Sequence, residues 1–398
     1  MKKIASVVCL LLASLLAGAQ EFDYNVGLDY LFNNYEYGAC RYQVGENYCY
    51  PYQYSHTLHG IRLTPEAGLL LAQTPSLYHR LRVGIDVFKQ MGEGVENLGL
   101  FREILLYYNV GAKFPGGRSL TAYAGCFPRR YGGGTGYIGP VFDTEYSYLD
   151  PNVEGIMIKY SIDKRLRAEL IFDWQGKVGD EYSPLRRERF QLLSDGQWRF
   201  AGDFSLGWTA SVYHYSKSPV CDNVVDYDLV NPRLVWEPFT WMDDLRLELG
   251  GIFTCQFDRK SGKAPVFPMG LWCLQSVSKW NVTISNRFYW GDDLMPFYDS
   301  SFEGITYGRD LYHGAVGFKT LHGTPSWADW LTISYQPRIS KWLSLDVAVV
   351  VHTGQPSEEL GARFFRGSDQ RIGVRIDLDP VRPHPKSPKK SRKPGMNL

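Results

Sequence analysis

The feature that most constrains this chain is an alternation of apolar and polar residues that recurs over most of its length. Clear examples lie at 80–87, 166–174, 245–250, 343–352 and 371–378. A period of two is typical of β-strands with one apolar and one polar face. After the first twenty residues, no segment holds the run of about eighteen apolar residues that a membrane-spanning helix needs. The sequence therefore predicts an all-β protein.

The residues that fill the two faces narrow the fold class. The apolar face is almost entirely aliphatic, with aromatic residues such as Tyr108, Trp174 and Trp290 toward the strand ends. An aliphatic belt bordered by aromatic girdles is typical of the outer surface of a membrane β-barrel. A soluble β-sandwich has the same alternation, but it hides its aliphatic face between two sheets. Alternation alone therefore leaves both folds open.

Strand length and connection length favour the barrel. The candidate strands run about ten residues or more, which suits tilted strands that cross a bilayer. Short connections are expected at 74–77, 115–118, 163–165 and 194–197. Long connections are expected at 34–55, 91–99, 130–152, 177–186 and 217–226. Membrane barrels alternate short periplasmic turns with long outer loops in this way.

We therefore predict a closed antiparallel transmembrane β-barrel of about 16 strands, with 16 or 18 as the even numbers that suit the length. A direct count gives about seventeen, which is odd, and the alternation of short and long connections breaks after residue 310. One strand in that region is therefore either missed or wrongly included.

Both ends of the chain are expected to lie outside the barrel, which covers 20–379. Residues 1–19 combine Lys2 and Lys3 with an apolar stretch and a small-residue cleavage site, which predicts a cleaved secretory signal peptide. Residues 380–398 hold five prolines and six Lys or Arg. This composition predicts a disordered basic tail, placed in the periplasm by its position after the last strand.

Charge and cysteine content exclude several kinds of site. The formal net charge of +1 gives no basic face for nucleic acid. Six cysteines follow the signal peptide, and Cys40 and Cys49 share one Tyr-rich loop, so they are the favoured disulfide pair; free thiols are the alternative. No Cys-x-x-Cys spacing occurs, so neither a structural zinc site nor another cofactor is expected.

The polar face supplies candidate lumen residues. They are Arg80, Arg82, Asp86, Lys159, Arg167, Glu169, Asp173, Arg246, Glu248, Arg287, Asp346, Arg371, Arg375 and Asp377. Opposed Arg and Asp or Glu rows in a narrow pore sort solutes by charge and size. The alternative is that these side chains pair with one another and plug a closed interior, which we favour for any single residue. For the whole set a hydrated lumen is favoured, because burying so many charges is costly.

A long loop supplies a second group of candidates. Segment 130–152 carries three consecutive glycines, and its candidate ligand-binding residues are Tyr131, Tyr137, Asp143, Glu145, Tyr146 and Tyr148. The loop either folds into the mouth and narrows it, stacks sugar rings on its tyrosines, or is a surface loop without a ligand. Segment 291–310 is similar and holds clustered acids, but without the spacing of a calcium loop.

Catalytic residues are not expected. None of the eight histidines stands in the Ser, His and Asn pattern of barrel phospholipases. His214 lies between Tyr213 and Tyr215, which we interpret as a strand with an aromatic girdle. The sequence therefore predicts a protein that is not an enzyme.

Two short motifs resemble a family of uncharacterised Bacteroidota outer-membrane barrels that are porin-like. They are Tyr148-Leu149-Asp150-Pro151-Asn152-Val153-Glu154-Gly155 and Phe172-Asp173-Trp174-Gln175-Gly176. The resemblance implies the barrel and the outer membrane of a Gram-negative bacterium, but not a substrate. Porin-like chains usually end in an aromatic residue that the barrel assembly machinery reads. Here the last strand ends near Leu378 and a basic tail follows.

The leading functional hypothesis is diffusion of small hydrophilic solutes or oligosaccharides through a charge-lined lumen. The alternative is a non-conducting outer-membrane barrel whose Tyr-rich extracellular loops bind a glycan or a protein partner. A third reading is a soluble secreted β-protein. The expected partners are outer-membrane lipid, a small solute or glycan and the barrel assembly machinery, without nucleic acid, and the oligomeric state is left open.

Overall fold

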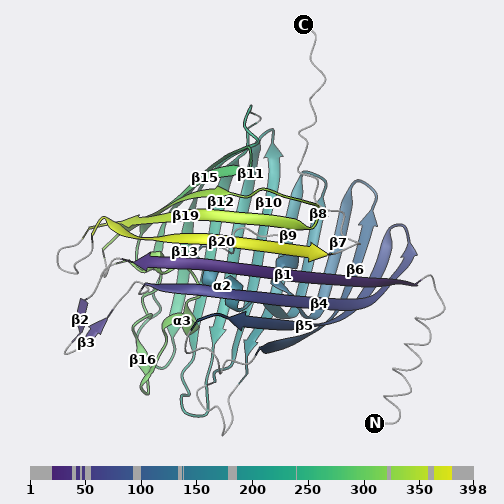
Figure 1. The fold of residues 1–398 in the computed structure, drawn as a ribbon. Helices are drawn as coiled ribbons and strands as arrows, with labels where there is room; N and C mark the ends of the chain where they lie inside the picture. Colours follow the sequence, from purple (N-terminus) through teal and green to yellow (C-terminus); the bar gives the residue numbers. More distant parts are fainter. Residues whose placement is uncertain are drawn as a thin grey trace.

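The computed structural model describes residues 20–37, 42–44, 47–49, 55–92, 100–132, 137, 139–177, 186–238, 240–320, 324–356 and 363–378. Within these ranges, sixteen antiparallel strands close into one barrel, in which neighbours along the chain pair and the first strand meets the last (Figure 1). The closing pair runs from Val26 opposite Leu378 to Tyr37 opposite Gly367. The predicted closed barrel with an even strand number near 16 is therefore confirmed.

The barrel strands are β1 (Gln20–Tyr37), β4 (His56–Thr74), β5 (Leu77–Gln90), β6 (Phe101–Phe114), β7 (Arg118–Pro128), β8 (Asn152–Ile162), β9 (Leu166–Gly176), β10 (Arg189–Ala201), β11 (Phe204–Tyr215), β12 (Val225–Trp236), β13 (Asp244–Asp258), β14 (Met269–Lys279), β15 (Val282–Gly291), β18 (Ser326–Tyr335), β19 (Leu343–Gly354) and β20 (Phe365–Leu378). The connections add the hairpins β2 (Tyr42–Val44) with β3 (Asn47–Cys49) and β16 (Ser301–Phe302) with β17 (Ile305–Thr306), the helices α2 (Thr144–Leu149) and α3 (Gly308–Leu311), and the 3-10 turns η1 (Arg129–Tyr131) and η3 (Val316–Phe318). None of the helices among the described residues has the length and apolar character that crossing a membrane requires.

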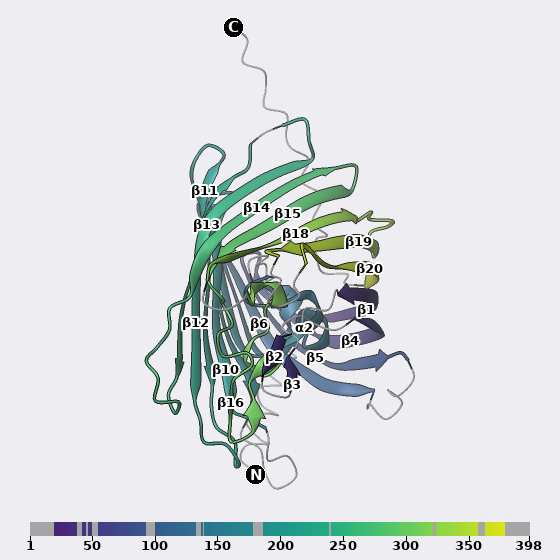
Figure 2. The same ribbon diagram turned by 90° about the vertical axis from the view of Figure 1, so that its left-hand side faces the viewer.

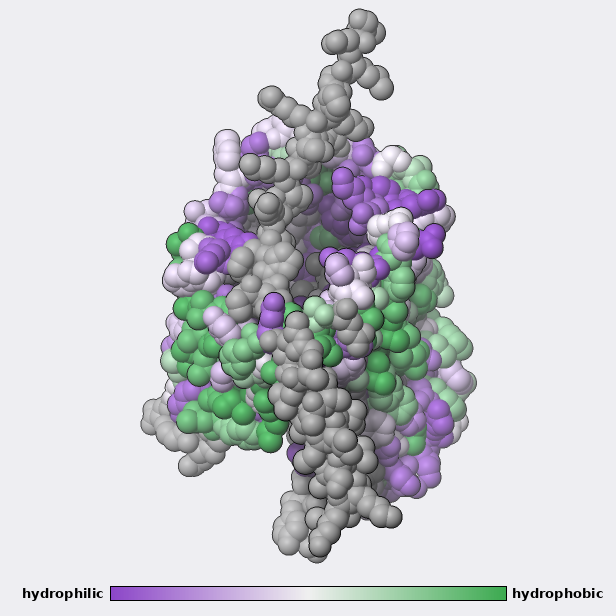
Figure 3. Space-filling model, turned by 90° about the vertical axis from the view of Figure 1, so that its right-hand side faces the viewer, coloured by the Kyte–Doolittle hydropathy of each residue, from purple (hydrophilic) through white to green (hydrophobic). Residues whose placement is uncertain are grey.

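The side-chain alternation places apolar residues outside and polar residues inside. On β5, the outward Val83 is 54% exposed, while the inward Arg82 next to it is fully buried. Ile104 and Leu249 on β6 and β13 are likewise exposed. Figure 3 shows broad hydrophobic areas on one face of the molecule. The aliphatic rows are therefore not pressed between two sheets, and the soluble sandwich is excluded.

Short and long connections alternate around the barrel, as predicted, with one error in the turns. The short turn expected at 194–197 lies within β10, and the chain reverses at Gly202 and Asp203. Asp195 is fully buried and pairs with Arg167 on the lumenal side. Gly196 makes room for the ring of Trp208, since an added Cβ would lie 2.1 Å from it. Asp195 and Gly196, although their residue types are common in turns, therefore lie within a strand of the barrel wall.

The irregularity after residue 310 has a simple origin. Residues 292–325 form one long connection from β15 to β18, and it contains β16, β17, α3 and η3. The next connection, 336–342, is short and falls on the same side as the other short turns. The alternation is therefore intact, and the extra strand of the sequence count belongs to this long connection.

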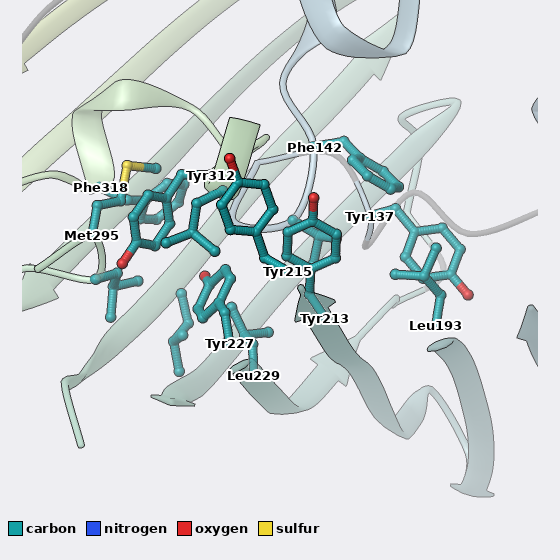
Figure 4. Close-up of a cluster of buried hydrophobic side chains, with 14 of the residues drawn as sticks. Tyr137, Phe142, Leu193, Tyr213, Tyr215, Tyr227, Leu229, Met295, Tyr312 and Phe318 are labelled. Carbon is teal, nitrogen blue, oxygen red and sulfur yellow. The ribbon is translucent and has the colours of Figure 1, made fainter. Parts of the chain in front are cut away.

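Two long connections enter the barrel, and we call them the first insert (129–151) and the second insert (292–325). Figure 2 shows α2 of the first insert within the ring of strands. They pack on strands whose lumenal face is aromatic, with Tyr213 and Tyr215 on β11 and Tyr227 on β12 pointing into the cluster (Figure 4). Burying these apolar faces drives the inserts inward. Our interpretation of Tyr213 and Tyr215 as an outer girdle is therefore wrong, since both are at most 1% exposed.

Candidate functional site

The two inserts are joined to each other inside the barrel. Asp143 of the first insert forms an ion pair with Arg309 of the second, and its backbone N–H donates to the carbonyl of His313 at 2.8 Å. Arg309 also donates from Nη1 to the carbonyl of Gly314 at 2.7 Å. The rings of Tyr146 and His313 stack with centroids 4.0 Å apart. The inserts therefore form one connected body rather than two independent loops.

The contact between the inserts buries titratable groups and compensates their charges. Asp143 caps α2, because its carboxylate accepts from the backbone N–H of Tyr146 at 2.6 Å. Burial raises the pKa of the Asp143 carboxyl, and the nearby Arg309 opposes that shift. Burial, together with Arg189, Arg309 and Arg129, holds the pKa of His313 well below its usual value. His313 is therefore neutral at neutral pH.

A buried polar network anchors the start of the first insert. The Glu66 carboxylate accepts from Asn25 at 3.0 Å, from Tyr107 at 2.5 Å and from Arg130 at 3.2 Å. Arg82, next to them, holds Asp23 through two bonds of 2.6 and 2.8 Å. Carboxylates in such settings need charged or hydrogen-bonded partners to remain buried. The network therefore ties η1 to β1, β4, β5 and β6.

A second network anchors the end of the same insert. Arg129 pairs with Asp173 of β9 at 2.8 Å and donates to the carbonyl of Asn152 at 2.7 Å. Arg62 pairs with Asp86 and donates to the carbonyl of Tyr148 at 2.7 Å. The first insert is consequently held by charged groups at both of its ends.

A third network runs along the wall from β9 to β13. Arg167 pairs with Asp195 at 2.7 Å, Asp195 with Arg233 at 3.5 Å, and Arg233 with Glu248 at 3.1 Å. Glu248 then pairs with Arg246 at 2.5 Å. The charges alternate in sign along this chain, so each is compensated by its neighbours.

The predicted lumen residues lie on the inner face of the barrel, and most of them are paired. Beyond the networks above, Arg80 pairs with Asp23 at 2.9 Å, and Lys159 donates to the carbonyl of Tyr131 at 2.5 Å. Arg371 pairs with Asp346 at 2.9 Å, and Arg375 with Asp29 at 3.5 Å. Glu169 is 4% exposed, and Asp377 sits at the turn-side end of β20. Mutual pairing therefore describes most of the individual residues, and their part in passage stays a prediction.

Two cavities that the inserts leave open lie against β1, β18, β19 and β20. A cavity of about 510 Å³ on the short-turn side, the inner cavity, is lined by Asp29, Arg62, Arg130, Tyr148, Asp346 and Arg375. A cavity of about 100 Å³ on the long-loop side, the outer cavity, is lined by Tyr37, Glu145, Arg287, His352, Arg366 and Arg371. The ion pair of Arg371 with Asp346 joins the linings of the two. Both cavities therefore lie between α2 and the wall of β19 and β20.

The candidate residues of the first insert lie inside the barrel. Tyr131 and Tyr137 are each 6% exposed and belong to the interior cluster, and Tyr146 packs on it. Glu145 contacts His56 at 3.3 Å and lines the outer cavity. Tyr148 lines the inner cavity and donates to the carbonyl of Gly60 at 3.1 Å. Folding into the barrel is thus the alternative that the structure bears out, and ligand binding by these residues stays untested.

Sequence reasoning missed the partners that complete these networks. Asp23 and Asn25 alternate with the outward Phe22 and Tyr24, a signal that could have identified them. Arg129 and Arg130 lie in the insert rather than on a strand, so no alternation marks them. Their pairing with residues far along the chain depends on how the insert folds inward.

Two acids of the second insert share one lysine. Lys319 pairs with Asp293 at 3.5 Å and with Asp299 at 3.0 Å. Among the residues that the structure describes, no group of three or more His, Cys, Asp or Glu side chains is arranged to hold a metal ion.

Several sequence expectations fall outside the described part of the chain. Cys126, Cys221, Cys255 and Cys273 are free thiols. Cys40 and the side chain of Cys49 lie outside the described residues, so the expected disulfide is untested. The signal peptide and the basic tail lie outside them as well.

Comparison with known proteins identifies the fold. No family model and no curated protein matches this chain. OccK8 (OprE) of Pseudomonas aeruginosa is similar in structure, with a TM-score of 0.50 and 10% identity over 91% of this chain and 99% of that one. OpdL of P. aeruginosa matches with a TM-score of 0.48 and 11% identity over 90% and 99%. A loop-deletion variant of OmpT, an outer membrane protein of Vibrio cholerae, matches with 0.49 and 9% over 90% and 99%.

Proposed function

We propose that this protein is a channel in the outer membrane of a Gram-negative bacterium, through which small hydrophilic solutes or oligosaccharides diffuse. The observation that carries the proposal is the space left between the inserts and the wall of β1, β18, β19 and β20, which is lined by charged side chains.

The placement in a membrane is supported by the outer face of the barrel. Outward residues such as Val83, Ile104 and Leu249 are 54%, 58% and 61% exposed. Leaving so many aliphatic side chains in water would be unfavourable, by about 25 cal/mol for each Å². A closed barrel also leaves no strand edge unpaired, as lipid surroundings demand.

The passage of polar solutes is supported by the lining of the cavities. The inner cavity combines cations such as Arg62 and Arg130 with the acids Asp29 and Asp346. The outer cavity combines Arg287 and Arg371 with Glu145. Charges of both signs across a narrow passage favour hydrated solutes over apolar ones.

Bilayer recording on two matched variants tests this proposal. Gly373 on β20 lines the inner cavity, and an added Cβ would meet Asp346 at 3.6 Å, which is ordinary contact. Gly373→Trp should therefore reach into the passage and lower single-channel conductance about twofold. Ile372→Trp, on the outward face of the same strand, is the control and should leave conductance unchanged.

The outcomes separate two functions. Conductance that falls with Gly373→Trp and not with Ile372→Trp supports the channel. A folded wild-type barrel without conductance steps would exclude it and favour the non-conducting barrel. That second candidate has one observation behind it, namely the filling of the barrel interior by the inserts.

A further inference from the structure

The side chain of Arg287 differs from the other cations of the barrel interior. It projects from β15 between Leu274 and Trp330 on the neighbouring strands and lines the outer cavity. A Cβ placed on Gly139 of the first insert would lie 3.7 Å from Nη1 of Arg287. The guanidinium group therefore reaches the narrow space between the barrel wall and the insert.

Among the described residues, none forms an ion pair or a hydrogen bond with the guanidinium group of Arg287, and the attraction that acts on it comes from Glu248 without such a contact. The acids of the outer cavity are engaged elsewhere. Glu145 contacts His56 at 3.3 Å, and Asp369 contacts His352 at 3.1 Å. Asp143 pairs with Arg309, and Asp329 accepts a hydrogen bond from Asn286. A partly buried guanidinium without a partner is costly, because its charge has lost water without a compensating contact.

Two charged residues of the wall act on Arg287 in opposite directions, Arg371 by repulsion and Glu248 by attraction. Arg371 of β20 lines the same cavity, and its electrostatic effect on Arg287 is repulsive. Arg371 has one acid, Asp346, at 2.9 Å, and that acid lies toward the inner cavity. Two guanidinium groups therefore face one cavity of about 100 Å³, in which the four acids of the lining, Asp143, Glu145, Asp329 and Asp369, each contact another residue.

We propose that Arg287 and Arg371 form a binding site for an oxyanion, a carboxylate or phosphate group, in the outer cavity. A guanidinium presents parallel N–H donors that match the two oxygens of such a group. Binding the anion supplies the partner that Arg287 lacks. The inference rests on the proposed function in one respect, since the anion reaches the site through the channel.

Calorimetric titration of the detergent-solubilised barrel with succinate, inorganic phosphate or glucose tests the site without requiring conduction. The variants are Arg287→Gln, which removes the charge, and Arg287→Lys, which keeps the charge but not the paired donors. Arg165→Gln removes the same charge at an exposed turn and is the control. Heat-modifiable migration on gels shows that each variant is folded.

Succinate, phosphate or both should bind the wild type, and glucose should not. Arg287→Gln should weaken binding about ten- to a hundredfold, the effect of losing a hydrogen bond to a charged group. The affinity of Arg287→Lys should lie between those of the wild type and Arg287→Gln, and the affinity of Arg165→Gln should match that of the wild type. Preference for one of the two anions identifies the class of ligand. Absence of binding by both, or equal affinity in Arg287→Gln and wild type, would overturn the inference.

Bilayer recording then distinguishes this inference from the channel proposal. Brief current blockades caused by the bound anion should shorten in Arg287→Gln and persist in Arg165→Gln. A barrel that binds anions but does not conduct would refute the channel and leave the site. A barrel that conducts but binds neither anion would refute the site and leave the channel.

Discussion

The contact between the inserts offers the sharpest test of how the interior is held closed. In Arg309→Ala, the side chain of Asp143, which is 14% exposed, loses its cationic partner. The backbone contact of Arg309 with Gly314 is lost as well. The inserts should therefore be released from each other in a larger fraction of molecules, a condition that we call the released state, because Asp143 regains water there.

The magnitude follows from burial. Removing one partner of a fully buried ion pair costs about 3 to 5 kcal/mol. Arg309 is 31% exposed, so solvent screening reduces the expected cost to about 2 kcal/mol. At 1.36 kcal/mol for each factor of ten, the released state should gain about thirtyfold.

Two measurements report the population of the released state. Single-channel recording reports it as current noise in the open state, and limited proteolysis reports it as the rate at which the inserts are cleaved. Asp143→Asn in the Arg309→Ala background should recover most of the loss, because asparagine still caps α2 and leaves no buried charge. The control is Arg259→Ala, which breaks a pair of 2.6 Å with Asp226 at a site where Arg259 is 53% exposed. Equal cleavage and noise in Arg309→Ala, the control and the wild type would refute the reasoning.

Three further outcomes are expected. Lowering the pH from 7.5 to 5.5 should increase open-state noise, because His313 takes up a proton below its usual pKa of about 6.5 when the inserts are released but not when it is buried. His313→Phe should remove that increase, and the raised pKa of Asp143 acts in the opposite direction as the pH falls. Arg82→Ala should lower the free energy of unfolding in urea by about 3 to 5 kcal/mol, because it leaves the buried Asp23 with one cation fewer, and an unchanged midpoint would contradict the pairing. Val83→Arg should lower stability in lipid vesicles by about 2 to 4 kcal/mol, whereas no loss would indicate that this face does not meet lipid.

The barrel itself could be predicted from the alternation of apolar and polar residues along each strand. In β5, β13 and β20, the residues predicted to face outward and inward do so, because a strand turns successive side chains to opposite faces wherever it is placed. The pattern failed where residue type was ambiguous. Ser194 to Gln197 have the composition of a turn, but Asp195 and Gly196 are set by partners on neighbouring strands.

The candidate site was predictable as a list of inward charges but not as an arrangement. Alternation placed Arg287 and Arg371 on the lumenal face, yet it could not distinguish the paired Arg371 from Arg287. That distinction depends on which acids the folded barrel brings within reach, and these lie far apart in sequence.

By itself, the sequence determined a closed cylinder with aliphatic residues outside and charges inside, because both follow from a period of two along each strand. The tertiary structure decided what occupies the cylinder. The inserts fold inward because the aromatic inner faces of β11 and β12 become a surface only when the strands close around them. The joining of Asp143 to Arg309, 166 positions apart in the chain, is a consequence of that closure.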